Sequence, residues 1–102
     1  MIMKKEKGKM YNDEKTKKMN ELENLMYNVA WLRTHFGLSQ KRMAELLRIS
    51  IYSISKIENG IFPPRLCVDV IFNISDHFGI RPIDLVSRKL SGEDIVLSKI
   101  VF

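Results

Sequence analysis

A chain of 102 residues, 45% hydrophobic and 28% charged, is expected to form one soluble globular domain with a modest core. It has no apolar run near the ~20 residues that a membrane-spanning helix needs, and its single cysteine excludes an internal disulfide and fits a reducing cytoplasm. Its net charge of +5 lies mainly in residues 1–20 and 39–65, which predicts a cytoplasmic protein with a phosphate-bearing partner and no membrane association.

The first segment, residues 1–19, is rich in lysine and has no hydrophobic period, so we expect a disordered, flexible tail. Asn20 followed by Glu23 resembles a capping box, which predicts the start of a first helix. Apolar residues then follow a helical period until Gly37 interrupts it. The predicted buried stripe consists of Leu22, Leu25, Met26, Val29, Leu32 and Phe36.

Residues 40–60 predict two short amphipathic helices joined by a tight turn. Ser39 and Ser50 are the expected N-caps, and the second helix of this pair should end at Asn59-Gly60. Ala44 is small where the two helices must touch. The apolar positions fall on one inner surface, formed by Met43, Leu47, Ile49, Ile54 and Ile57. This arrangement is typical of a helix-turn-helix, whose second helix enters the major groove of DNA.

The remaining elements are shorter and less regular. Phe62-Pro63-Pro64 predicts an extended linker, because each proline disfavours helix at the residue before it. A fourth helix is expected from Arg65 to Phe78, and a fifth from Pro82 to near Leu90. Residues 95–97 and 100–102 are apolar and fit either a strand or a helix. The predicted organisation is a tail (1–19), a DNA-binding domain (20–90) and a C-terminal extension (91–102).

The stretch from about Asn28 to Leu85 resembles the lambda-repressor/Cro-like (xenobiotic-response-element) family of DNA-binding domains. The matching residues are Leu32-Arg33, Gly37-Leu38-Ser39-Gln40, Met43-Ala44, Ile49-Ser50, Ser53 to Gly60, Pro64 and Phe78-Gly79-Ile80. The resemblance implies an all-α bundle of five helices. Two departures stand out: Arg48 occupies a turn position that is usually Gly, and residues 60–78 are about two residues longer than the common pattern.

Base reading is expected from the outer face of the third helix. Lys56 can donate to guanine O6 and N7, Ser55 can meet donor or acceptor edges, and Ile51 can pack on a thymine methyl. The helix has no Arg, Gln or Asn in its first two turns, so we expect modest direct readout supplemented by DNA shape and half-site spacing. The predicted DNA-binding residues are Gln40, Lys41, Arg48, Ser50, Ile51, Tyr52, Ser55, Lys56, Asn59 and Arg65, with Arg42 as a further phosphate contact.

Simpler roles stand beside these assignments. Ile51 can belong to the core, Lys56 can be a solvated charge, and Gln40 can be an exposed polar residue. Arg48 either adopts a left-handed conformation at a cost of roughly 1–2 kcal/mol, or the turn uses right-handed dihedral angles. The resemblance implies that Arg33 forms a structural ion pair with Glu58, and that Gln40 also packs against the start of the recognition helix.

Catalytic and metal-binding patterns are missing from the sequence. Cys67 lies on the inner stripe of the fourth helix and is interpreted as a small core residue. His35 and His77 are far apart, and one cysteine with two histidines offers no standard metal-ligand spacing. There is no glycine-rich phosphate loop and no nucleophile signature. We therefore expect no cofactor, no metal and no enzymatic activity.

The sequence favours a transcriptional regulator, more specifically a repressor, that binds a pseudo-palindromic operator in double-stranded DNA as a dimer. The alternative is an antitoxin-type module that binds a protein partner through residues 1–19 or 93–102, with autoregulatory DNA binding as a secondary role. Residues 1–19 are either a solvated tail or a contact to the minor groove or phosphates. The surplus apolar residues Tyr27, Trp31, Val68 and Phe72 fit either a larger core under a folded-back extension, or a homodimer interface of the fifth helix and residues 93–102, with paired strands as one form.

Overall fold

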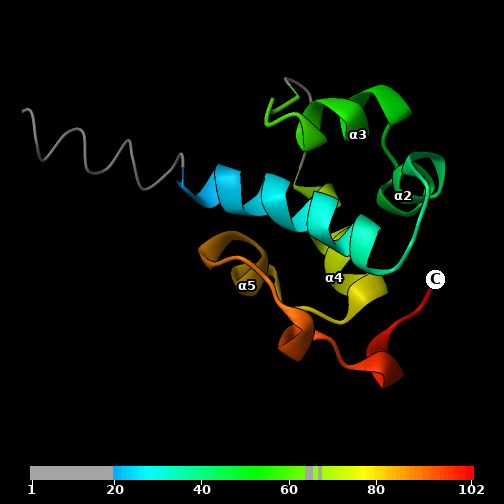
Figure 1. The fold of residues 1–102 in the computed structure, drawn as a ribbon, viewed down its shortest axis with the longest axis vertical. Helices are drawn as coiled ribbons and strands as arrows, with labels where there is room; N and C mark the ends of the chain where they lie inside the picture. Colours follow the sequence, from blue (N-terminus) through cyan, green and yellow to red (C-terminus); the bar gives the residue numbers. More distant parts are fainter. Residues whose placement is uncertain (1–19, 64–65, 67) are drawn as a thin grey trace, which may run out of the picture.

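The computed structural model describes residues 20–63, 66 and 68–102, and within them the chain forms five α-helices and two short 3-10 turns (Figure 1). The first helix is described over residues 20–35, and the others are α2 (Gln40–Leu47), α3 (Ile51–Glu58), α4 (Asp69–Phe78) and α5 (Pro82–Ser87). The expectation of an all-α, five-helix fold is confirmed. The predictions for residues 1–19, Arg65 and Cys67 lie outside the described residues.

The core is a continuous cluster to which all five helices contribute. Each helix buries one apolar stripe, and α2 contacts both α3 and α4, while α4 also contacts α5. The fully or nearly fully buried hydrophobic residues are Leu25, Val29, Leu32, Met43, Ala44, Leu46, Leu47, Ile54, Ile57, Val70, Ile74, Phe78, Ile80, Leu85 and Leu90. Leu22 was predicted to join this stripe but is 40% exposed, because it lies on the rim of an open groove.

The predicted start of the first helix lies at the edge of the described residues. Asn20 is the first described residue and is already helical, so the position of the helix N-cap lies outside the described part of the chain. At the other end, Gly37 adopts φ 65°, and Leu38 N donates to Arg33 O (2.9 Å), which closes the helix as expected. None of the helices in the described part of the chain is both long and apolar enough to traverse a bilayer.

Helix α4 begins at Asp69, four residues later than the expected start at Arg65. Leu66 N donates to Pro63 O (3.3 Å), so the chain still turns at this point, and Val68 serves as an N-cap without a side-chain bond. Leu66 packs partly against the core from this turn. The apolar spacing therefore begins before the helix itself begins, because Leu66 in the preceding turn also faces the core.

Helix α5 ends at Ser87 and not near Leu90 because a buried side chain caps it. Asn28, 0% exposed, donates from Nδ2 to the carbonyls of Leu85 and Arg88, both at 2.8 Å. Its Oδ1 accepts from Leu90 N at 2.9 Å. These three bonds satisfy backbone groups at the end of α5 that a longer helix would have paired internally. The first helix and the end of α5 are thereby joined.

The C-terminal extension folds back over the core and takes two 3-10 turns, Gly92–Asp94 and Leu97–Lys99. Val101 N donates to His77 O (2.8 Å), and His77 Nδ1 donates to Val101 O (2.6 Å). The Phe102 ring packs edge-on against Phe36 and Phe78, with centroids 5.5 and 5.3 Å apart. The suggestion of strands in this extension is therefore wrong for the described residues, while the folded-back extension is what the chain adopts.

The surplus apolar residues divide between core and surface. Trp31 packs partly against the core and stacks on His35 with ring centroids 4.5 Å apart. Tyr27 remains exposed, with Lys89 Nζ 4.9 Å from its ring centroid. Val68 and Phe72 also remain exposed. The larger core therefore includes Trp31 and the extension, and excludes Val68 and Phe72.

Candidate nucleic-acid interface

Two serine caps fix the beginnings of α2 and α3. Ser39 accepts from Arg42 N at 3.0 Å, and Ser50 accepts from Ser53 N at 3.0 Å, as the sequence predicted. Each serine satisfies a backbone N–H that has no partner within its own helix. Ala44 is buried between the helices, where a larger side chain would separate them. The two serine caps thus set where α2 and α3 begin, and the small side chain of Ala44 allows the two helices to approach closely.

The turn between α2 and α3 is left-handed at Arg48, with φ 59° and ψ 43°. Arg48 N donates to Glu45 O (3.3 Å) and Ile49 N donates to Ala44 O (3.0 Å), which is the Schellman pattern of helix termination. The sequence left two conformations open at this position, and the strained one is observed. Arg48 is the one non-glycine residue with positive φ in the described part of the chain, and its side chain is exposed.

A side chain from α4 completes this turn. Asn73 donates from Nδ2 to Leu47 O at 3.0 Å, and so satisfies a carbonyl at the end of α2. Sequence reasoning missed both Asn73 and Asn28. Each lies next to buried apolar positions of its own helix, and a polar residue on an apolar stripe was the available signal for a capping role.

The outer face of α3 carries an exposed aromatic and cationic surface. Tyr52 is 69% exposed and Ile51 is 48% exposed, so Ile51 does not take the core position considered as its simpler role. Ser55 and Lys56 are half-buried on the same helix, and Lys56 Nζ lies 4.9 Å from the centroid of the Tyr52 ring. A cation over a tyrosine face is held electrostatically by the ring, which orients the Lys56 ammonium along the helix surface.

A three-residue polar cluster holds the far end of α3. Arg33 donates from Nε to Glu58 Oε2 and from Nη2 to Glu58 Oε1 (2.9 Å), and Gln40 donates to the same Oε1 at 3.1 Å. Burial raises the pKa of Glu58, but the hydrogen bonds from Arg33 and Gln40 outweigh it, so the pKa lies below its ordinary value. Gln40 therefore hydrogen-bonds to Glu58, the last residue of α3.

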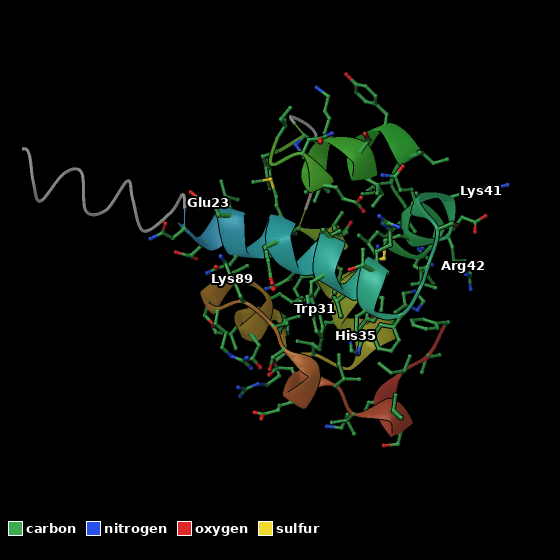
Figure 2. The ribbon with its side chains drawn as sticks, viewed as in Figure 1. Glu23, Trp31, His35, Lys41, Arg42 and Lys89 are labelled. Atoms are coloured by element: carbon green, nitrogen blue, oxygen red, sulfur yellow. The ribbon has the colours of Figure 1, made fainter. Side chains whose placement is uncertain are left out.

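The remaining predicted contact residues differ in how free their side chains are. Lys41 and Arg42 point away from the body of the protein beside α2 (Figure 2), with Arg42 in a long 3.6 Å ion pair with Glu45. Ser50 uses its hydroxyl in the cap of α3. Asn59 donates back to Ser55 O (2.9 Å) within its own helix. These two side chains would have to give up internal bonds before contacting DNA with the same groups.

The described residues offer no competing metal chemistry. Among residues 20–63, 66 and 68–102, no group of three His, Cys, Asp or Glu side chains could hold a metal ion. The charged residues there form ion pairs, of which Arg33–Glu58 and Arg88–Asp94 join segments from different elements. In the clearest of these, Arg88 donates to both oxygens of Asp94 (2.9 and 2.6 Å), and that hydrogen bonding lowers the pKa of Asp94 to about 2.

Comparison with known proteins gives one result that bears on this surface. A family model described as a helix-turn-helix domain matches residues 27–91, which include the first helix from residue 27 and all of α2 to α5. No curated protein and no solved structure matches the chain.

Proposed function

The chain belongs to the helix-turn-helix family of Cro-like DNA-binding domains, and from this premise we propose that it regulates transcription by reading a specific double-stranded site through α3. The observation that carries the proposal is the separation of the two faces of α3. Its inner residues Ile54 and Ile57 are buried, whereas Ile51 and Tyr52 extend into solvent. Such an exposed face on a packed helix fits the depth and width of the major groove.

Positive charge surrounds this surface on the neighbouring helix and turn. Lys41 and Arg42 are exposed on α2, and Arg48 is exposed in the turn that precedes α3. Each of these cations can neutralise a phosphate and release a counterion, which gives affinity but no sequence information. Base reading would then rest on Tyr52, Ser55, Lys56 and Ile51.

We further propose that the regulator is a dimeric repressor on a pseudo-palindromic operator. Support comes from apolar side chains that remain exposed on α5 and the C-terminal extension, namely Ile83, Val96, Leu97 and Val101. Exposed apolar surface of this kind is typical of an interface between copies. Sedimentation of wild type beside Leu97→Lys tests this. Dissociation of a wild-type dimer by that one substitution is expected, and a wild-type monomer at all concentrations would contradict it.

The principal experiment measures DNA binding by fluorescence anisotropy. The wild-type chain is titrated against the DNA upstream of its own gene and against a scrambled duplex of the same composition, from about 50 to 200 mM salt. We expect tighter binding to the upstream DNA. The double variant Tyr52→Ala, Lys56→Ala should lose most of that preference, about 5- to 30-fold, which corresponds to about 1–2 kcal/mol.

The chain supplies a matched control for this variant. Tyr27 and Lys89 form a second tyrosine–lysine pair with the same 4.9 Å separation. This pair lies beside Ile57 and Glu58 at the end of α3, and not on the face that carries Tyr52 and Lys56. The double variant Tyr27→Ala, Lys89→Ala removes the same groups and the same charge, and should leave the preference unchanged. Equal losses in the two double variants, or wild-type binding that is the same on both duplexes, would show that α3 does not read the sequence.

A further inference from the structure

Lys56 belongs to the last turn of α3, but its charge lies over the first turn. Its Nζ is 4.9 Å from the centroid of the Tyr52 ring, four residues earlier in the helix. Side chains in an α-helix lean toward its N-terminus, so the Lys56 side chain can reach back over this turn. The ammonium is thereby placed one turn, or about 6 Å, nearer to the beginning of α3 than the Lys56 backbone is.

This displacement brings a positive charge to the part of α3 that needs one. The N-terminal residues of a recognition helix are those that contact base edges in the major groove. Residues 51–54, which form the first turn of α3, have no charged side chain of their own. The Lys56 ammonium therefore supplies the charge that this turn lacks.

The Tyr52 ring is the group that holds this ammonium. None of the five ion pairs in the described part of the chain includes Lys56. The nearest acid in the sequence is Glu58, and its carboxylate already accepts hydrogen bonds from Arg33 and Gln40. Among the described residues, the charge of Lys56 is thus directed by an aromatic face and is not neutralised by a carboxylate.

A lysine that reads a base needs such a constraint. Its ammonium is a point charge on a flexible stem, without the rigid planar fork of arginine, and the phosphates on both sides of the groove attract it. An ammonium over a ring keeps donors on the side that faces away from the ring. Guanine offers two neighbouring acceptors, O6 and N7, to such donors in the major groove.

We propose that Tyr52 is a positioning residue that directs the Lys56 ammonium to O6 and N7 of a guanine. This inference rests on the proposed function, because it requires α3 to enter the major groove. It gives the two side chains different roles: Lys56 contacts the base, and Tyr52 acts through Lys56. The attraction uses the ring and not the hydroxyl, so phenylalanine should substitute for Tyr52 and leucine should not.

The contact between the two side chains is tested by NMR on the free, full-length chain. Protons over an aromatic ring resonate upfield, so the Hε protons of Lys56 should lie upfield of those of the exposed Lys41. Tyr52→Phe should keep this shift and Tyr52→Leu should abolish it. Tyr27→Leu is the matched control, because it removes the ring of the other tyrosine–lysine pair and should leave the Lys56 signals unchanged.

The contact with guanine is tested by removing single acceptor atoms from the DNA. Each guanine of the upstream duplex is replaced in turn by 7-deazaguanine, which lacks N7, and binding is measured by fluorescence anisotropy at one salt concentration. We expect at least one replacement to weaken wild-type binding about 5- to 10-fold. For Lys56→Met, the duplexes with and without this replacement should bind within about twofold of each other.

The Tyr52 variants then separate positioning from direct contact. Tyr52→Leu should reduce the effect of the sensitive replacement to about twofold, as Lys56→Met does, whereas Tyr52→Phe and Tyr27→Leu should retain the full effect. Once Lys56 is methionine, Tyr52→Leu should change the effect of this replacement no further, because the two side chains act as one unit. Tyr52 is 69% exposed, so these substitutions leave the core intact.

Three results would overturn the proposal. One is an equal loss of guanine sensitivity in Tyr52→Phe and Tyr52→Leu, which would assign the effect to the hydroxyl. Another is a Tyr52→Leu variant that binds every duplex more weakly by one factor and keeps the wild-type sensitivity. The third is a Lys56 Hε shift that is the same with and without the Tyr52 ring.

The same titrations distinguish this inference from the proposed function. Wild-type binding that is equal on the upstream and scrambled duplexes would refute both. A preference for the upstream DNA in which Lys56→Met relieves the effect of no guanine replacement would refute the inference alone.

Discussion

Replacing Arg48 with glycine should make the domain more stable while weakening its attachment to DNA. Arg48 sits at φ 59°, where an L-residue with a side chain loses roughly 1–2 kcal/mol relative to the right-handed conformation. Glycine removes that cost but loses about 0.4–1 kcal/mol through the greater freedom of the unfolded chain. The net gain in unfolding free energy is about 0.5–1 kcal/mol, or about 2–6 °C in Tm for a domain of this size.

The same substitution removes a cation from the edge of the proposed interface. No described acidic residue pairs with Arg48, so its loss breaks no ion pair in the described part of the chain. If Arg48 contacts a phosphate, the dependence of log K on log salt concentration should become shallower by about one unit, and affinity should fall similarly for every sequence.

Arg48→Ala separates the two effects. Alanine removes the guanidinium but keeps a β-carbon at positive φ, so it should weaken DNA binding as glycine does without the gain in stability. Unfolding in urea and anisotropy titrations over a salt series measure the two quantities. Equal stabilities of the glycine and alanine variants would refute the strain argument, and an unchanged salt dependence in both would refute the phosphate contact.

Three further predictions concern the packing of the domain. Asn28→Ala should lower the unfolding free energy in urea by about 2–4 kcal/mol, because two carbonyls and one N–H at the end of α5 lose their buried partner; a loss below 1 kcal/mol would contradict this. Gly79→Ala should lower the unfolding free energy by about 1 kcal/mol more than Gly37→Ala, and should speed amide exchange in the C-terminal extension. Both glycines have φ 65°, but of the two only Gly79 would place a β-carbon 2.5 Å from Lys99 Cβ. Arg88 lowers the pKa of Asp94 to about 2, so Asp94 contributes stability that is complete above the ordinary pKa of 3.8 and is lost as the pH falls toward 2. Asp94→Asn should therefore flatten the pH dependence of Tm between about pH 4 and 2. A pH dependence of Tm that is unchanged in this variant would show that Asp94 does not cause the loss of stability in acid.

Sequence reasoning succeeded where the determining interactions are local. The caps at Ser39 and Ser50 depend on a side chain and a backbone N–H three residues apart, so the sequence alone predicts them. The positive φ of Arg48 is harder to predict, because glycine is the residue that usually indicates a positive φ and this turn has an arginine instead. The spacing of the residues identified the turn between α2 and α3, but it did not predict the left-handed conformation of Arg48.

The errors arise where distant segments decide the outcome. The early end of α5 depends on Asn28, which lies more than 50 residues away in the chain. The contact of Gln40 with Glu58, 18 residues away, likewise depends on how α2 and α3 pack. The C-terminal extension has strand-like composition but follows the shape of the core beneath it, with Phe102 packed against two other aromatic rings. Hydrophobic period predicts which residues are apolar neighbours and does not predict which polar groups will meet.

The hydrogen bonds of Asn28 have a consequence for the order in which the chain folds. They join positions 57 to 62 residues apart, so they close a loop that includes α2, α3, α4 and most of α5. Closing so long a loop costs entropy that only the assembled core repays, which places these bonds late on the folding pathway. A fragment ending after α4 would leave the Asn28 amide facing apolar side chains with no partner. The helix-turn-helix is therefore expected to fold and unfold cooperatively with the rest of the domain, and the N-terminal half should not be stable on its own.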